Sequence, residues 1–209
     1  MLPEIILASA SPARLKLLRS VGITPVVKVS SVDEEAEIRR NNWVSPAEIA
    51  QGLAVLKAEN IVNQDAPEHA LVIGCDSVME QAGQALGKPD NKEIAQRRLR
   101  ALSGSFGTLH TGHCVIYCSE KSPVIIQRLV STDVYFHELT DSEIDAYIET
   151  GEPLRVAGSF TLDALGAPFI KSISGEASNV VGISLPMLRT IFGELGFGWD
   201  EILRKVTVE

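Results

Sequence analysis

The sequence predicts an α/β fold built on a mixed β-sheet that helices flank. Strand and helix signals alternate through the first half, an order typical of parallel strands joined by helical crossovers. The segment 70–75 is short and continuously apolar, which indicates a strand buried on both faces. The strand candidates 109–119 and 124–136 are separated only by a short polar turn at 120–122, so we expect an antiparallel hairpin. Parallel crossovers combined with a long hairpin make the sheet mixed.

In the first half, local signals mark where the elements begin. A short apolar strand at 5–7 leads to Pro12, which suits the first position of a helix. Ser45 and Glu48 form a capping box with a proline between them, and the helix they open runs to about Val62. The other elements expected in this half are a strand at 24–29 and a hairpin at 78–86 that turns near Gly83.

The second half has similar start and stop signals. A helix from about Lys92 ends at Leu102, and Gly104 can then adopt the left-handed cap. Thr140 and Glu143 form a second capping box, and their helix stops before Gly151. The last expected elements are a strand at 169–173 and a helix at 186–195.

Length and composition limit the class of protein. With 209 residues and 45% apolar content, the chain can bury the core of one domain or of two closely joined lobes. A net charge of -8 without a stripe of lysine and arginine argues against nucleic acid as the main partner. No stretch approaches the roughly 20 apolar residues of a membrane span, so we expect no membrane partner and no secretion signal. Three cysteines form no disulfide framework, which favours a reducing, cytoplasmic location.

The turn after the first strand has the chemistry of a phosphate cradle. Ser9 and Ser11 are small hydroxyl residues directly before a helix whose first turn contains Arg14. Hydroxyls, the free N–H groups of a helix start and a guanidinium all bind phosphate well. Any α/β protein needs such a strand-to-helix turn, however, so this segment alone decides nothing.

Three further charged residues stand at informative places. Asp76 ends an apolar strand, where ligands gather in open α/β sheets, and it could bind a metal, polarise a water or cap a turn. Lys57 shares the apolar stripe of its helix, so it either reaches solvent along the surface or meets an anionic partner. Lys88 precedes a proline, which restricts its backbone and therefore the direction in which its ammonium points.

The acidic run 32–37 is interpreted as a solvated loop, one member of which could bind a metal that bridges phosphates.

A zinc site is an alternative for one other cluster. Its members lie in the strand candidate 109–119, where alternation puts the two cysteines on one face and the second histidine on the other. The spacing matches no zinc knuckle. The residues of this cluster are His110, His113, Cys114 and Cys118.

Taken together and in this order, these segments resemble the Maf family of nucleoside triphosphate pyrophosphatases, relatives of the inosine triphosphatase-like fold. The resemblance spans nearly the whole chain. Its motifs are LASASPAR (7–14), VDE (32–34), KA (57–58), GCDSV (74–78), LGKP (86–89), LSG (102–104), GEPL (151–154), AGSF (157–160) and NVVGISLP (179–186).

The resemblance implies one Maf-like domain over 1–209, with two lobes of an extended mixed sheet around a central substrate cleft. It implies hydrolysis of the α–β phosphate bond of nucleoside triphosphates to a monophosphate and diphosphate, aided by Mg²⁺ or Mn²⁺. Asp76 matches the proton acceptor and, with Glu34, a metal ligand. A homodimer is common in such families. The implied substrate-binding residues are Ser9, Ser11, Arg14, Lys57, Lys88 and Asp163.

The chain departs from the family pattern at two positions. Ala13 stands where many members have the first of two arginines, so one cation is missing. Asp163 stands where one branch has the glutamine of dTTP and UTP hydrolases and another has the glutamate of 7-methyl-GTP hydrolases. The substrate of neither branch can therefore be assigned to this chain. An acidic side chain that contacts the base could favour a cationic or donor-rich base.

A nucleotide-binding regulator of cell division or septum formation, without essential catalysis, is the alternative function.

Overall fold

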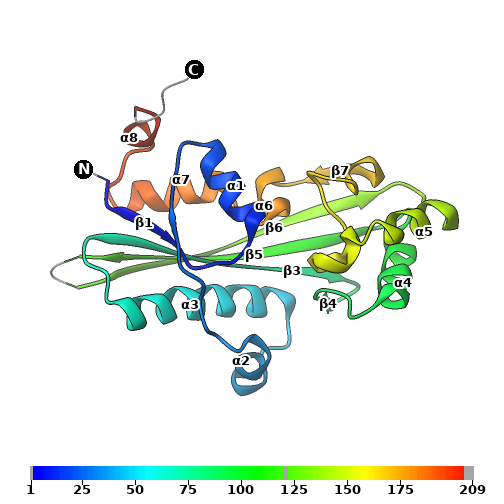
Figure 1. Ribbon diagram of the computed structural model, residues 1–209, viewed down its shortest axis with the longest axis horizontal. Coiled ribbons are helices and arrows are strands. Elements are labelled where there is room, and N and C mark those ends of the chain that lie inside the picture. The colour runs from blue at the N-terminus through cyan, green and yellow to red at the C-terminus, as the bar shows by residue number, and fades with distance from the viewer. Residues whose placement is uncertain (1, 120–121, 205–209) are drawn as a thin grey trace.

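The computed structural model describes residues 2–119 and 122–204, and it shows one long sheet with helices on both faces (Figure 1). The sheet has seven strands in the order β2-β1-β3-β5-β6-β7, and β4 pairs with β3 outside this path. The strands are β1 (Glu4–Leu7), β2 (Val26–Val27), β3 (Ala70–Gln81), β4 (Gln84–Leu86), β5 (Phe106–Cys118), β6 (Val124–Phe136) and β7 (Ile170–Ser174).

The sheet is mixed, which confirms the predicted fold class. β1 lies parallel to both β2 and β3, whereas β4, β5, β6 and β7 pair antiparallel with their neighbours. The long hairpin of β5 and β6 forms as expected; residues 120–121 of its turn lie outside the described residues. The division into two lobes around a cleft stays a prediction.

Helix α3 (Pro46–Asp65) covers one face of the sheet, and α1 (Pro12–Ser20) and α7 (Leu185–Glu194) cover the other (Figure 1). Two glycines let α3 approach closely. A Cβ at Gly74 would lie 2.1 Å from the carbonyl oxygen of Ala54, and one at Gly112 would lie 2.3 Å from that of Ala50. The backbone of α3 therefore rests directly on β3 and β5.

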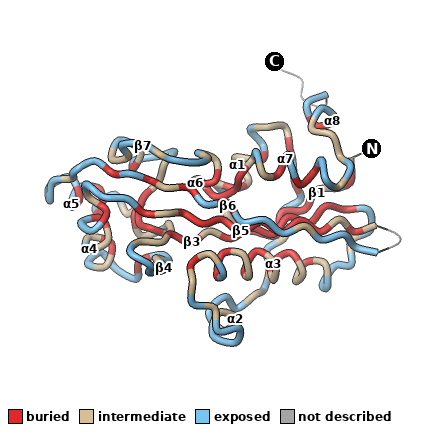
Figure 2. Tube along the Cα trace, turned by 180° about the vertical axis from the view of Figure 1, so that it is seen from behind, coloured by how far each residue is buried: buried red, intermediate tan, exposed pale blue. Residues whose placement is uncertain are grey.

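Two further helices lie at one end of the sheet. At the end opposite the β5–β6 hairpin, α4 and α5 pack through a small apolar cluster that includes Leu99 and Ile144. Figure 2 shows that buried residues follow the central strands and the helix faces turned toward them. No helix within 2–119 and 122–204 is both long and apolar enough to cross a bilayer. The other helices are α2 (Glu34–Asn41), α4 (Lys92–Leu102), α5 (Asp141–Glu149), α6 (Ala177–Val181), α8 (Trp199–Leu203) and the 3₁₀ turns Glu152–Arg155, Ala157–Ser159 and Ala167–Phe169.

The predicted start and stop signals are confirmed where local chemistry sets them. Both capping boxes form, at Ser45 and at Thr140, and Gly83 turns the β3–β4 hairpin at φ +79°. Two expectations were wrong. The strand at 24–29 shortens to two paired residues, and the acidic run is no loop, because Asp33 caps the N-terminus of α2.

Candidate functional site

The candidate site lies at a gap in the edge of β3. β1 pairs with β3 only as far as Leu7 opposite Ile73, and β4 pairs on the same side only from Leu86 opposite Met79. Among the described residues, no strand pairs with β3 at 74–78 on this side.

The loop after β1 borders one end of the gap, where the backbone N–H of Ala8 donates to the carbonyl oxygen of Ile73, and Gly87 and Lys88 follow β4 beyond the other end. The carboxyl end of β1 lies at this gap, and ligands bind at such ends in open α/β sheets. The prediction that Asp76 ends its own strand was wrong, because β3 continues to Gln81.

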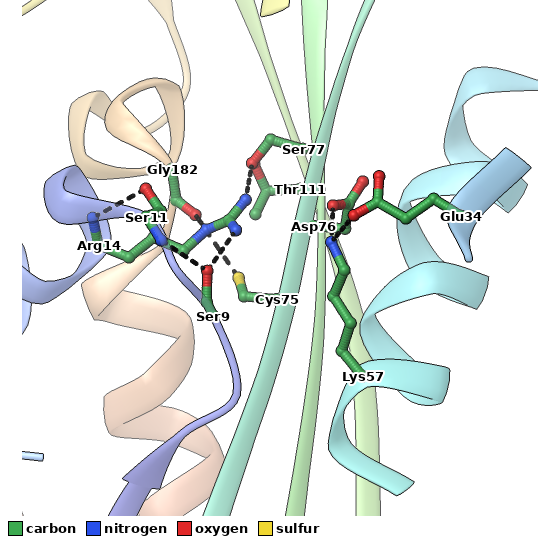
Figure 3. A network of polar contacts seen from close by, with 10 residues as sticks. All are labelled: Ser9, Ser11, Arg14, Glu34, Lys57, Cys75, Asp76, Ser77, Thr111 and Gly182. Atoms are coloured by element: carbon green, nitrogen blue, oxygen red, sulfur yellow. Dashed lines mark hydrogen bonds and ion pairs between the residues drawn. The ribbon is translucent and has the colours of Figure 1, made fainter. Parts of the chain in front are cut away.

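Strand alternation divides the polar residues of the gap between the two faces of the sheet. Figure 3 shows Ser9, Ser11 and Arg14 on one side of β3, and Glu34 and Lys57 on the other. The two groups meet through consecutive residues of β3, because Ser77 faces Arg14 and Asp76 faces Lys57.

On the first face, the side chain of Arg14 forms hydrogen bonds with three separate segments of the chain. Its Nε donates to the Gly182 carbonyl oxygen at 2.8 Å, and its two terminal nitrogens donate to the hydroxyls of Ser9 and Ser77, each at 3.0 Å. The side chain of Ser11 caps α1 by accepting the Arg14 backbone N–H at 3.4 Å. Although Arg14 is charged, it is only 8% exposed, so this fork is largely shielded from solvent.

On the second face, a buried lysine bridges two carboxylates. The Nζ of Lys57 lies 2.5 Å from Oδ1 of Asp76 and 2.8 Å from Oε1 of Glu34. Lys57 belongs to the buried stripe of α3, together with Leu53 and Ile61. The structure therefore answers the question that the sequence left open, because this lysine meets anionic partners.

Burial and charge set the protonation of this pair. Burial raises the pKa of the Asp76 carboxyl, and the opposing effects of Lys57 and Arg14 do not cancel the rise. Burial lowers the pKa of Lys57, but the negative charges of Asp76 and Glu34 outweigh that effect and raise it overall. Lys57 therefore stays an ammonium, and Asp76 accepts a proton more readily than an exposed aspartate does.

Within 2–119 and 122–204, no hydrogen bond or ion pair joins the two other predicted residues to Arg14, Lys57 or Asp76. Lys88 is exposed just beyond β4, and no described residue forms an ion pair with it. Asp163 is part of the segment between the second and third 3₁₀ turns, and its carboxylate lies 3.7 Å from the Nζ of Lys16 on α1. Asp163 thus sits on the α1 side of the sheet and apart from Asp76.

Sequence reasoning assigned no role to two residues of the site. The hydroxyl of Ser77 contacts both Arg14 and Thr111, the latter at 3.0 Å. The Gly182 carbonyl accepts from Arg14, 168 positions away in the chain. Alternation along β3 could have placed Ser77 opposite Asp76, but no local signal pairs Arg14 with Gly182.

Comparisons with known proteins identify the family of this chain. The sequence profile described as "Maf-like protein" matches residues 4–195. The chain belongs to the Maf-like family. Its curated relatives include proteins of Streptomyces coelicolor and Streptomyces avermitilis, each 50% identical over 95% of this chain and 94% of the relative. A Nostoc punctiforme relative is 43% identical over 94% of this chain and 95% of its own length. All three are named "Nucleoside triphosphate pyrophosphatase".

The alternative zinc cluster of this Maf-like chain is divided by the sheet. Cys114 and Cys118 pack in the apolar layer beneath α3, while the Nε2 of His113 accepts from the backbone N–H of Ser184 on the other face. His110 is engaged by Glu80 and Ser131, each at 2.8 Å. These four side chains therefore do not share one coordination sphere.

A divalent cation fits the second face of the gap. Glu34 and Asp76 already converge on one cationic atom, the Nζ of Lys57, and carboxylate oxygens are the ligands that Mg²⁺ prefers. Within the described residues, no three histidine, cysteine, aspartate or glutamate side chains group to hold a metal. Two carboxylates completed by phosphate oxygens and waters match the way Mg²⁺ is bound beside polyphosphates.

Proposed function

We propose that this chain hydrolyses the α–β phosphate bond of nucleoside triphosphates, releasing a monophosphate and diphosphate. The names of its relatives support this reaction class. The observation that carries the proposal is the buried Lys57–Asp76 ion pair at the gap in β3, which the half-exposed Glu34 joins. Burying two ionised groups is costly unless their chemistry is used, and perturbed buried charges of this kind concentrate at active sites.

The cations of the gap give an acidic protein a local site for a polyphosphate. Arg14 lies on one face, Lys57 on the other, and Lys88 follows the strand that closes the far end of the gap. We propose that the triphosphate lies along the free edge of β3, with Ser9 and Ser11 among its ligands. The net charge of -8 makes this local neutralisation necessary.

Asp76 is the residue that we assign to proton transfer. Lys57 binds Oδ1, so Oδ2 is the oxygen that takes the proton of the attacking water. The water oxygen bonds to phosphorus, the bridging P–O bond breaks, and the diphosphate leaves with the electron pair of that bond. Lys57 stabilises the carboxylate before transfer, and no serine or cysteine nucleophile is needed.

We assign Glu34 and Asp76 as the ligands of a divalent cation, Mg²⁺ or Mn²⁺. When bound, such an ion neutralises phosphate oxygens and favours the departure of the diphosphate. Glu34 is half exposed at the start of α2, so it can turn from Lys57 toward a cation that enters with the substrate.

Asp163 is our candidate for reading the base. It lies on the α1 side of the sheet, and its contact with Lys16 is long and exposed. A carboxylate favours a cationic or donor-rich base, such as a modified purine, and removal of such nucleotides from a cytoplasmic pool is the role we propose. The D163Q variant, compared across a nucleotide panel, should reorder the substrates; an unchanged ranking removes Asp163 from base recognition.

The proposed reaction is tested by diphosphate release with Mg²⁺ or Mn²⁺. We expect D76N to lose at least about a hundredfold in kcat, as removal of a proton-transfer group does. Glu34 and Glu35 provide a matched pair, because they are neighbours in α2 and only Glu34 reaches Lys57. E34Q should lose activity while E35Q keeps it. Equal activity of D76N and wild type would mean that Asp76 is not the proton acceptor, whereas the absence of diphosphate release from wild type would support a nucleotide-binding regulator instead.

A further inference from the structure

Glu152, which opens the first 3₁₀ turn, accepts hydrogen bonds from three parts of the chain. Its Oε1 accepts from the hydroxyls of Tyr147 and Thr161, at 2.8 and 2.5 Å, and from the backbone N–H of Gly166 at 3.1 Å. Its Oε2 accepts from the backbone N–H of Leu165 at 3.3 Å. One carboxylate therefore binds α5 and both ends of the segment 161–166.

These bonds close the segment 161–166, which we call the Asp163 loop. The hydroxyl of Thr161 at its start also accepts from the backbone N–H of Gly166 at its end, at 3.1 Å. The two ends pack so closely that a Cβ on Gly166 would lie 2.7 Å from the carbonyl oxygen of Thr161. The residues between them, 163–165, are exposed and contribute little packing. The conformation of the loop therefore depends on its two ends, where the carboxylate binds.

Glu152 stays an anion in this environment. Burial alone raises the pKa of its carboxyl, but the hydrogen bonds from Thr161, Tyr147 and the backbone outweigh that effect and lower the pKa. Among the described residues, no lysine, arginine or histidine forms an ion pair with it. The N–H and O–H donors therefore balance its charge, and a carboxylate binds such donors more strongly than a neutral acceptor does.

The Asp163 loop extends from Glu152 to α1, the helix that contains Arg14. The carboxylate of Asp163 lies 3.7 Å from the Nζ of Lys16, and both side chains are exposed. An exposed contact of this length is too weak to fix the loop. The position of Asp163 relative to α1 is therefore set by the bonds to Glu152.

We infer that Glu152 is a positioning residue for base recognition, because its carboxylate fixes the Asp163 loop and so the direction of the Asp163 side chain. The inference rests on the proposed function, in which Asp163 contacts the base. A loop that is ordered before the nucleotide binds does not have to be ordered at the cost of binding free energy. Without Glu152, nucleotide binding should weaken while the chemical step stays intact, since Asp76 and Lys57 lie on the other face of the sheet.

Hydrogen exchange of the full chain tests the loop without reference to catalysis. Glutamine has the shape of glutamate, but its amide group cannot accept at both positions, so E152Q should speed exchange of the Leu165 and Gly166 amides at least about tenfold. T161V removes a donor of the loop itself and should act in the same direction. E149Q is the matched control, because Glu149 lies three residues earlier and forms its ion pair on the exposed surface. Unchanged exchange in E152Q and T161V overturns the inference.

Kinetics then separate recognition of the base from recognition of the phosphates. E152Q should raise KM for the preferred nucleotide about tenfold and change kcat less than about twofold. Inorganic triphosphate has no base, so its inhibition constant should be the same in E152Q and wild type. D163A should also raise KM, and adding E152Q to D163A should raise it no further, because the side chain that Glu152 positions is gone.

The outcomes distinguish a positioning role from a general structural one. If E152Q weakens binding of inorganic triphosphate as much as binding of the nucleotide, or raises KM equally in the D163A background, the inference is wrong. A KM that stays unchanged despite faster exchange overturns it as well. If wild type releases no diphosphate, the proposed function fails, and hydrogen exchange still decides whether Glu152 fixes the loop.

Discussion

Acidification should destabilise this protein through one buried histidine, His113. The residue is fully buried on β5, and its Nε2 accepts the backbone N–H of Ser184 at 2.9 Å. Accepting this bond requires the neutral ring. Burial lowers the pKa of His113 from 6.5 to about 4, and the positive charge of Arg14 acts in the same direction.

The sign and size of the effect follow from proton linkage. Between pH 6.5 and 4 the unfolded chain binds a proton at His113 and the folded chain does not, so stability falls as the pH falls. At 1.36 kcal/mol per pKa unit, this difference amounts to about 3 kcal/mol between pH 7 and pH 4. That is a large part of the total stability of a typical domain.

The assay is urea unfolding at several pH values, followed by the fluorescence of the two tryptophans. Carboxylates also titrate in this range, so the informative quantity is the difference between wild type and H113Q. Glutamine can accept from Ser184 without binding a proton. The stability advantage of wild type over H113Q should therefore shrink by about 3 kcal/mol from pH 7 to pH 4. H137Q is the control, since His137 is exposed. An advantage that stays constant over this range would refute the reasoning.

Three other perturbations have defined outcomes. K57M leaves Asp76 buried without its ammonium and should lower the free energy of unfolding by about 3 kcal/mol, measured in urea, while K57M/D76N should recover part of this loss. R14K keeps the charge but cannot reproduce three fixed donors, so kcat/KM for triphosphate hydrolysis should fall at least about tenfold. G74A overlaps α3 and should cost about 1–3 kcal/mol in thermal unfolding, whereas G193A, with open space around its Cα in α7, should be neutral or stabilising.

The sequence predicted those parts of the fold that short-range chemistry determines. The capping boxes at Ser45 and Thr140 each depend on residues three positions apart, and both were confirmed. The continuity of β3 could not be predicted in the same way. The sequence indicated a strand at 70–75 and a separate hairpin from 78, and pairing with β5 joins them into one strand through Asp76 and Ser77. That pairing is tertiary, and no local pattern encodes it.

The candidate site shows the same division. Lys57 drew attention because a lysine on an apolar helical stripe needs a partner, and the structure supplies two carboxylates. The prediction of a loop for the acidic run 32–37 was wrong, because Asp33 and Glu34 are as compatible with the start of a helix as with a solvated loop. The gap in β3 was not visible at all. It exists only because β1 and β4 end at different points on a third strand.

The gap also explains how one strand can bring the cations of both faces of the sheet to one ligand. Side-chain alternation sends Asp76 toward Lys57 and Ser77 toward Arg14, so two consecutive residues serve both faces of the sheet. A ligand lying along the free edge would meet the cations of both faces, whereas a ligand above either face would meet only one. Arg14 and Lys57 are already fixed by hydrogen bonds and ion pairs among the protein's own groups. The charges are thus arranged during folding, so the reaction we propose would need little reorganisation when negative charge develops on the leaving diphosphate.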